Sequence, residues 1–185
     1  MSYRNSNYAA FYVADDFNTS NLGANQAPDF CYYNLLRAWK GDDSSFPFID
    51  AHAKTYNVRD DSKWETLQKR LHERLDSSKN IILFLSKNTQ ASRALNEEIN
   101  YGVNVKGLPV IVVYPDFTKC EDIAYSNDIR QPVKNLWNKL PIFKTNMLKV
   151  ATLHIPMDKS TIRKALSLDT FTVQNMCKAN TYFYK

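Results

Sequence analysis

Runs of apolar residues alternate along this chain with segments whose apolar residues recur every three or four positions. The plainest run, 80–86 (NIILFLS), is apolar from Ile81 to Leu85 and stops at Ser86. A continuous apolar run of this length is typical of a strand that is buried on both faces of a parallel sheet. Similar runs predict four further strands, at 8–14 (YAAFYVA), 46–51, 108–114 and 150–155.

The segments between these runs have helical spacing. In residues 62–75 the apolar positions Trp64, Leu67, Leu71 and Leu75 predict one buried helical stripe, and Ser62-x-x-Glu65 is typical of a helix start. For the last stretch, up to Tyr184, the pattern leaves a helix and a packed tail open. Further helices are predicted over 28–40, 91–105, 133–138 and 158–168.

Strands that alternate with helices predict an α/β fold with a parallel sheet and helices on both faces. Five strands in this order suit the flavodoxin-like arrangement, strand order 2-1-3-4-5. Pro47 has no N–H to donate, so the strand at 46–51 is expected at a sheet edge. At 185 residues we expect a single domain over 1–185. Its core would span about 7–168, with an elaborated loop and helix region at 116–146 and a C-terminal extension at 170–185.

The composition narrows the classes of partner. The net charge is +5, but the Lys and Arg residues are scattered, so we expect no nucleic-acid partner. Cys31, Cys120 and Cys177 are far apart and form no CxxC or Cys/His cluster, which predicts no metal site and fits a reducing cytoplasm. No apolar leader follows a basic start, and no segment approaches the ~20 apolar residues of a membrane span. We therefore expect a cytoplasmic protein with no membrane partner.

Ligands of such sheets bind beyond the carboxyl ends of the strands, where the strand order reverses. Here this edge would receive Asp15, Asp16 and Ser86, together with Asp50 and the loop at 52–59. The chain has four glycines and neither GxGxxG nor a P-loop, which argues against a Rossmann dehydrogenase and a P-loop enzyme. A receiver domain would need an aspartate at the end of the third strand, and Ser86 cannot form an acyl phosphate.

The helix predicted over 91–105 carries two adjacent glutamates, Glu97 and Glu98. At about 100° per residue, Glu98 falls on the edge of the apolar stripe, with room left by Gly102, whereas Glu97 points toward water. Partial burial would raise the pKa of Glu98. Structural carboxylates outnumber catalytic ones, so two ordinary helix glutamates remain the alternative. The stripe consists of Leu95, Ile99 and Val103.

These residues resemble the third strand and following helix of TIR domains. In that family a serine at the strand end precedes the motif S-x-W-C-x-x-E-L, and here Ser92 is followed six residues later by Glu98-Ile99, with Ala94-Leu95 in place of Trp-Cys. The likeness covers residues 7–115 and extends to the TIR-like subunit of the bacterial Thoeris anti-phage systems. It is carried there by the runs YYNLLRAWKG (32–41), FPFIDAHAKT (46–55) and VRDDSKWETLQKRLHERLDSSKN (58–80).

The resemblance implies an NAD+ glycohydrolase or cyclase, with NAD+ as substrate and no cofactor. One carboxylate is sufficient for this chemistry, because nicotinamide is already a cationic leaving group. Glu98 would be the catalytic residue. The substrate-binding residues would be Phe11, Asp50, Ser86, His52, Asp15 and Tyr101.

The resemblance also implies a role in anti-phage defence. The product would be a signal derived from ADP-ribose, with a cyclic form favoured, and it would activate a separate effector. A phage-derived activator, for which a capsid protein is one candidate, would switch the enzyme on. Assembly into a homo-oligomer is left open.

Two other functions stay open at this point. Many TIR domains are scaffolds, so the chain could be a non-catalytic TIR-like assembly module. A nucleoside deoxyribosyltransferase-like enzyme shares the fold and uses a glutamate nucleophile. Release of nicotinamide from NAD+ would favour the TIR enzyme, whereas base exchange on deoxynucleosides would favour the transferase.

Overall fold

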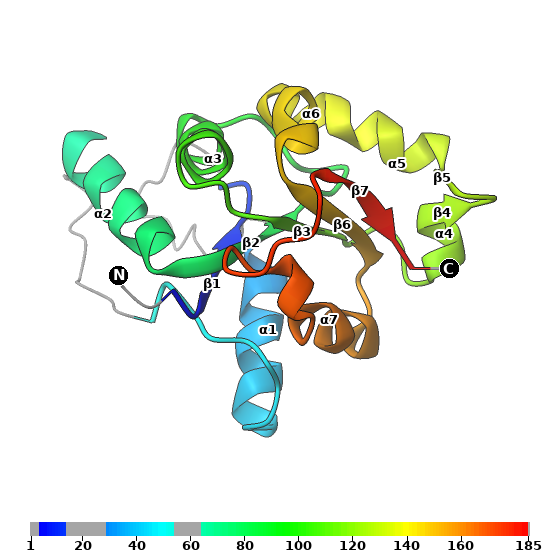
Figure 1. The fold of residues 1–185 in the computed structure, drawn as a ribbon, viewed down its shortest axis with the longest axis horizontal. Helices are drawn as coiled ribbons and strands as arrows, with labels where there is room; N and C mark the ends of the chain where they lie inside the picture. Colours follow the sequence, from blue (N-terminus) through cyan, green and yellow to red (C-terminus); the bar gives the residue numbers. More distant parts are fainter. Residues whose placement is uncertain (1–3, 14–28, 54–63, 185) are drawn as a thin grey trace.

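The computed structural model describes residues 4–13, 29–53 and 64–184. Its centre is a five-stranded sheet in the order β1-β2-β3-β6-β7, and every neighbouring pair is parallel (Figure 1). Parallel neighbours need long crossover connections, which the helices supply. The strands are β1 (Ser6–Ala10), β2 (Ser78–Phe84), β3 (Val110–Tyr114), β6 (Ala151–Pro156) and β7 (Asn180–Phe183).

Helices cover both faces of this sheet (Figure 1), which confirms the predicted α/β, flavodoxin-like arrangement. One face carries α1 (Phe30–Asp42) and α7 (Lys159–Leu166). The other carries α2 (Trp64–Asp76), α3 (Arg93–Ile99), the π-helix η3 (Asn100–Val105), α5 (Gln131–Leu136) and α6 (Pro141–Asn146). No helix in the described ranges combines the length and apolar character that crossing a membrane would require.

Short elements connect these layers. They are α4 (Cys120–Ile123), the hairpin strands β4 (Ala124–Tyr125) and β5 (Asp128–Ile129), and the 3-10 turns η4 (Trp137–Lys139), η5 (Met147–Lys149) and η6 (Asp169–Phe171). Most of them fall in the region 116–146, which was predicted to be elaborated.

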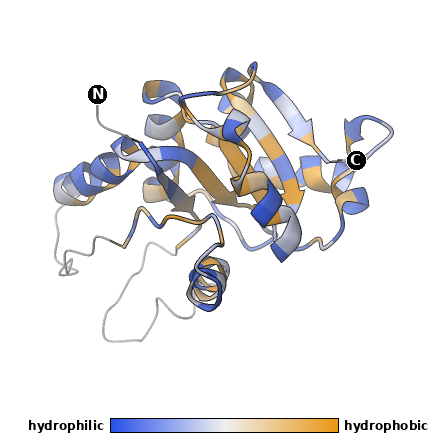
Figure 2. Cartoon of the chain, turned by 60° about the horizontal axis from the view of Figure 1, so that its bottom comes forward, coloured by the Kyte–Doolittle hydropathy of each residue, from blue (hydrophilic) through white to orange (hydrophobic). Residues whose placement is uncertain are grey.

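The side chains of β2 alternate between two hydrophobic cores. Ile81 and Leu83 pack on the side of α2 and α3, whereas Ile82 and Phe84 pack on the side of α1 and α7. Figure 2 shows the same concentration of hydrophobic residues along the strands. The apolar run therefore is a strand buried on both faces, as predicted.

The predicted strand at 46–51 is reduced to one parallel bridge between Asp50 and Asn7 of β1. The Asn7 N–H donates to the Ile49 carbonyl at 2.6 Å, and the Ala51 N–H donates to the Asn7 carbonyl at 3.1 Å. The ladder stops there because the Asn7 side-chain oxygen accepts the Ile49 N–H at 2.8 Å. The segment still lies on the outer side of β1, so the predicted order 2-1-3-4-5 is kept.

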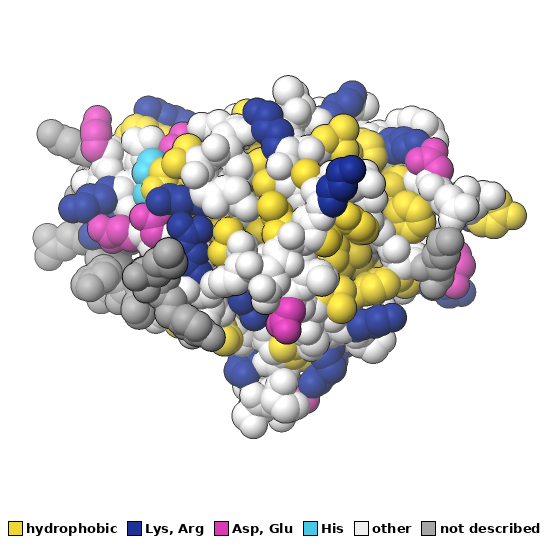
Figure 3. Space-filling model, in the orientation of Figure 1, with side chains coloured by type: hydrophobic (Ala, Val, Ile, Leu, Met, Phe, Trp, Pro, Cys, Tyr) yellow, Lys and Arg dark blue, Asp and Glu magenta, His cyan; other side chains and the backbone are white. Residues whose placement is uncertain are grey.

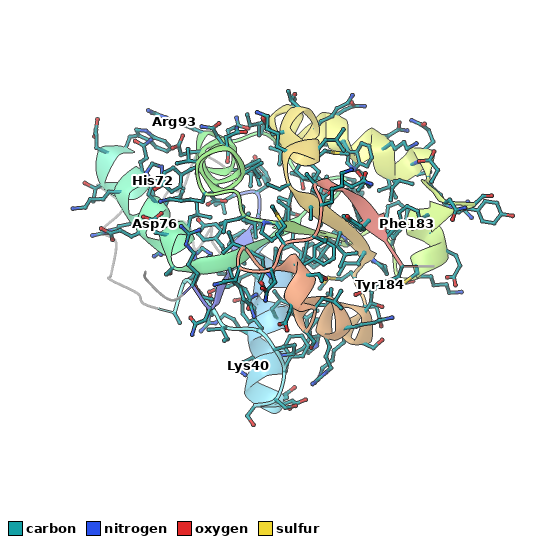
Figure 4. All side chains as sticks on the ribbon, viewed as in Figure 1. Lys40, His72, Asp76, Arg93, Phe183 and Tyr184 are labelled. Carbon is teal, nitrogen blue, oxygen red and sulfur yellow. The ribbon has the colours of Figure 1, made fainter. Side chains whose placement is uncertain are left out.

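The C-terminal extension adds a strand beyond that order. β7 pairs in parallel with β6, from Ala151 opposite Asn180 to His154 opposite Phe183. Of the two alternatives for this stretch, the helix was wrong; the tail does pack against the core, through Phe171, Val173 and Met176, and it ends in a strand that was not predicted. Hydrophobic side chains gather over β7 (Figure 3), near Phe183 and Tyr184 (Figure 4), and β7 forms the edge of the sheet beyond β6.

The predicted helix at 91–105 divides into α3 and the π-helix η3. Gly102 lies where this helix packs closely against β2 and α2. A Cβ at this position would stand 2.4 Å from Ile81 Cδ1 and 3.3 Å from Leu75 Cδ2. The prediction that Gly102 leaves room beside Glu98 was wrong. Ile81 and Leu75 fill that space, and the glycine permits close packing instead.

Candidate active site

Glu98 is held at the junction of α3 and β1. The Ser92 Oγ accepts the Leu95 N–H at 3.2 Å and so caps the helix. Leu95 and Ile99 are buried against the sheet, which fixes the rotation of the helix about its axis. Glu98 then lies at the edge of this stripe, and its Oε1 accepts a hydrogen bond of 2.9 Å from Tyr8 Oη.

A cavity of about 320 Å³ opens beside Glu98. This volume is within the range of about 300–1,000 Å³ that is usual for small-molecule sites. The walls come from β1 and the residues that follow it, the first residue of α1, the turn at His52, one side of α2, and α3 with its N-cap. The lining residues are Tyr8, Ala9, Phe11, Val13, Phe30, His52, Leu67, Leu71, Arg74, Ser92, Ala94 and Glu98.

The environment of Glu98 opposes its ionisation. Burial raises the pKa of this carboxyl to about 8, and the hydrogen bond from Tyr8 and the charge of Arg74 oppose that rise. Its Oε2 is buried and has no hydrogen-bond partner within the described residues. A buried carboxyl oxygen of this kind costs free energy in the folded protein unless a ligand or water satisfies it.

Aromatic rings form one wall of the cavity. Phe11 stacks on Tyr33 with ring centroids 5.4 Å apart and lies 5.7 Å from Phe30. The His52 ring lies 4.7 Å from Tyr8. Flat apolar surfaces opposite a carboxyl group are suited to an aromatic ligand that carries polar or cationic groups.

His52 is neutral in this setting. Burial and the neighbouring Arg74 charge lower its pKa to about 4, against the opposing charge of Asp50. Its Nε2 lies 3.0 Å from the Ala9 carbonyl, which can only accept, so we assign the ring proton to Nε2. Nδ1 then accepts from Arg74 Nη1 at 3.4 Å. His52 thus orients Arg74 rather than acting as a cation.

Asp50 does not line the cavity, although it was predicted to bind substrate. Its Oδ2 accepts from Tyr33 Oη at 2.7 Å, and its Oδ1 accepts the His52 N–H at 2.8 Å. Arg37 Nε lies 3.9 Å from the same carboxylate. The structure therefore gives Asp50 the role of holding the turn that presents His52.

Ser86 does not line the cavity either. Its Oγ donates to Asp29 at 2.7 Å, and the Thr89 hydroxyl donates to the other Asp29 oxygen at 2.9 Å. Burial raises the pKa of Asp29, which these two donors oppose. All three residues are buried, and they fasten the carboxyl end of β2 to the start of α1.

Tyr101 lies away from the cavity, in η3. Its hydroxyl donates to Asp76 at 3.0 Å, and its ring stacks on His72 with centroids 3.5 Å apart. Glu97 accepts from His72 Nε2 at 2.7 Å and from Gln68 at 2.9 Å, so the prediction that it points freely into water was wrong. In Figure 4, His72 lies between α2 and α3. Asp15 lies outside the described residues.

Of the residues predicted to form the site, the structure brings Glu98, Phe11 and His52 together around one cavity. The sequence reasoning missed Tyr8 and Arg74. A tyrosine in a strand that is buried on both faces needs a partner for its hydroxyl, and that signal could have identified Tyr8. Arg74 adjoins Leu71 and Leu75 on the predicted stripe of its helix, so a charge beside an apolar face could have identified it.

Comparison with known protein families identifies the family of the region that contains the cavity. Residues 8–120, more than half of the chain, match the family described as Thoeris protein ThsB, TIR-like domain. The match runs from β1 past β3, and all residues that line the cavity lie inside it. The chain therefore belongs to the family of the TIR-like domain of the Thoeris protein ThsB.

Proposed function

We propose that this protein cleaves the bond between nicotinamide and ribose in NAD+ and releases a product derived from ADP-ribose. The observation that carries the proposal is the Glu98 carboxyl, whose buried Oε2 is unpartnered within the described residues and which lines a cavity of about 320 Å³. Membership of the Thoeris ThsB family supports the choice of substrate.

The reaction needs one carboxylate near the ribose. The C–N bond breaks, its electron pair leaves with nicotinamide, and positive charge develops at the anomeric carbon. Ionised Glu98 stabilises that charge by Coulomb attraction in a poorly solvated site. Water then bonds to the anomeric carbon and gives up a proton to Glu98 or to solvent, which yields ADP-ribose; alternatively, a nucleophilic atom of the same molecule forms that bond and yields a cyclic product. Nicotinamide leaves as a neutral molecule, so no general acid is required.

The raised pKa of Glu98 fits a site that is completed by its substrate. With the cavity empty, a pKa of about 8 leaves much of the carboxyl protonated at pH 7. The cationic nicotinamide ring would favour the ionised form when it enters, because an opposite charge nearby lowers a carboxyl pKa. Substrate binding and the ionisation of Glu98 would therefore support one another.

We propose from the family that the product is a signal, with a cyclic form favoured, in bacterial anti-phage defence. It would act on a separate effector, after a phage-derived component has activated the protein. The same argument gives a cytoplasmic enzyme with NAD+ as substrate and no added cofactor.

The test is to incubate the purified protein with NAD+, with and without lysate of phage-infected cells, and to separate the products by chromatography. We expect nicotinamide release that Glu98→Gln abolishes. Glu97→Gln is the matched control, since Glu97 neighbours Glu98 on α3 but bonds to α2. No release in either condition, or equal release by Glu98→Gln, would contradict the proposal. Base exchange on deoxynucleosides would instead support a transferase.

A further inference from the structure

The cavity contains one acidic and one basic side chain, and within the described residues the two do not form an ion pair. Glu98 and Arg74 both line it, yet none of the ion pairs within the described residues joins them. A carboxylate and a guanidinium in one partly buried site would normally pair. Both groups therefore remain available to a ligand.

Within the described residues, most of the N–H donors of the Arg74 side chain have no hydrogen-bond partner. A guanidinium carries five N–H groups. In the part of the chain that the structure describes, its side chain makes one hydrogen bond, the 3.4 Å contact to His52 Nδ1. Arg74 also lies in the last turn of α2, where the helix dipole favours a cation.

His52 fixes the direction of this guanidinium. Its Nε2–H donates to the Ala9 carbonyl of β1, and its Nδ1 faces Arg74. The turn that carries His52 is itself held by Asp50 and Tyr33. A guanidinium that is oriented before the ligand arrives loses less conformational entropy on binding.

We propose that Arg74 binds the diphosphate of NAD+, so that the cavity recognises its substrate at two points of opposite charge. Glu98 takes the nicotinamide ribose, and Arg74 takes the anionic diphosphate that is attached to the same ribose. The fork of the guanidinium matches two phosphate oxygens. This inference rests on the proposed function and names a substrate-binding residue for it.

A substrate series separates this role from a general effect on Glu98. NAD+ carries a diphosphate, nicotinamide mononucleotide carries one phosphate, and nicotinamide riboside carries none. A charge-assisted hydrogen bond contributes about 1.5–3 kcal/mol, so Arg74→Met should lower kcat/KM for NAD+ about 10- to 100-fold. The loss should be smaller for the mononucleotide and absent for the riboside. Arg74→Lys should restore part of the loss.

Lys69→Met is the matched control, because Lys69 is an exposed cation on the same helix. It removes the same net charge from α2 without touching the cavity, and we expect no change for any of the three substrates. Arg74→Met should fold, since Ser77 and Ser78 hold the Arg74 backbone carbonyl at 2.9 and 2.8 Å and that contact stays. Melting curves of the variants check this.

An equal loss for NAD+ and the riboside would overturn the proposal, and so would no loss for NAD+. Binding to the Glu98→Gln variant decides the matter independently of turnover. Calorimetric titration should show that ADP-ribose binds more tightly than adenosine, and that adding Arg74→Met removes this difference while Lys69→Met does not. If nicotinamide release fails but this binding pattern holds, the proposed function falls and the diphosphate site stands. Absence of ADP-ribose binding overturns the site itself.

Discussion

Two buried polar clusters lie on the same face of the sheet, one beside β1 and one beside β6. In the second, Trp137 donates to Tyr114 Oη at 2.8 Å, Tyr114 donates to His154 Nδ1 at 2.6 Å, and His154 Nε2 lies 3.2 Å from Thr152 Oγ1. Each of these groups has its partner. In the first, Glu98 has one bonded oxygen and one that lacks a partner within the described residues.

The difference separates a structural network from a candidate functional one. Burial lowers the pKa of His154 to about 3, so its ring stays neutral and its two nitrogens complete a closed chain. Glu98 is buried too, but its Oε2 has no hydrogen-bond partner within the described residues. Local consistency is expected to fail at sites that bind something else. Of these two clusters, the one beside β1 contains a buried polar atom that has no partner within the described residues.

The largest expected effect is on stability at Glu98. Because its folded pKa, about 8, exceeds the 4.5 of a free carboxyl, the folded state binds more protons between these values, and stability falls as pH rises through this range. The displacement corresponds to an upper bound of about 5 kcal/mol. We expect Glu98→Gln to raise the free energy of unfolding at pH 8 and to change it little at pH 4.5. Urea unfolding at both pH values measures this.

Glu97→Gln provides the control for that measurement. Hydrogen bonds from Gln68 and His72 lower the pKa of Glu97, so its stabilising contribution is present above the ordinary carboxyl pKa and is lost as pH falls. The two variants should therefore shift stability at pH 8 in opposite directions. A shift of the same sign for both would mean that Glu98 is not desolvated.

The next effect concerns the second cluster, in which Trp137, Tyr114, His154 and Thr152 are all partnered. His154→Ala leaves the Tyr114 hydroxyl without its acceptor and opens a cavity between β6 and the helices beside it. We expect a loss of about 3 kcal/mol in the free energy of unfolding, with no change in nicotinamide release once the protein is folded. Thermal melting followed by an activity assay below the melting temperature measures both. A fall in activity larger than the unfolded fraction explains would mean that the cluster of His154 also contributes to catalysis, contrary to this prediction.

The sequence allowed the strands to be predicted, but not which side chains form the two clusters. Apolar runs and helical spacing located β1, β2, β3 and β6, because such strands are buried on both faces and leave an unambiguous pattern. The same spacing placed Glu98 correctly relative to Leu95 and Ile99. Single-element patterns could not reveal which elements meet.

Contacts between distant segments explain what the sequence missed. Ser86 and Asp50 follow strand ends, where ligand-binding residues are expected; in the structure their side chains form hydrogen bonds with Asp29 and Tyr33, which no single-element pattern shows. Tyr8 and Arg74 join the cavity only because β1 and α2 pack beside α3. β7 was missed because its four residues carry too little pattern to distinguish a strand from a tail.

Tyr8→Phe tests the hydrogen bond that Tyr8 Oη donates to Glu98 Oε1. The O–H of Tyr8 stabilises the ionised form, and its removal should lower nicotinamide release about tenfold, which corresponds to one hydrogen bond of about 1.4 kcal/mol. The acid side of the pH–rate profile should also move to higher pH, because the carboxylate loses a donor. A tenfold loss without that movement would mean that the Tyr8 hydroxyl does not act through the ionisation of Glu98.

The smallest effect is expected at Ser86, where two roles are distinguishable. If Ser86 only fastens β2 to Asp29, Ser86→Ala should cost about 1 kcal/mol of stability and leave KM for NAD+ unchanged, because Thr89 still donates to the same carboxylate. If Ser86 binds substrate, as its place at the strand end predicts, KM should rise while stability changes little. Thr89→Val removes the other Asp29 donor and serves as the structural reference. If the two variants change melting temperature and KM alike, Ser86 has a structural role only, as His154 does. If KM increases for Ser86→Ala alone, Ser86 binds substrate, and the substrate site that contains Glu98 reaches the carboxyl end of β2.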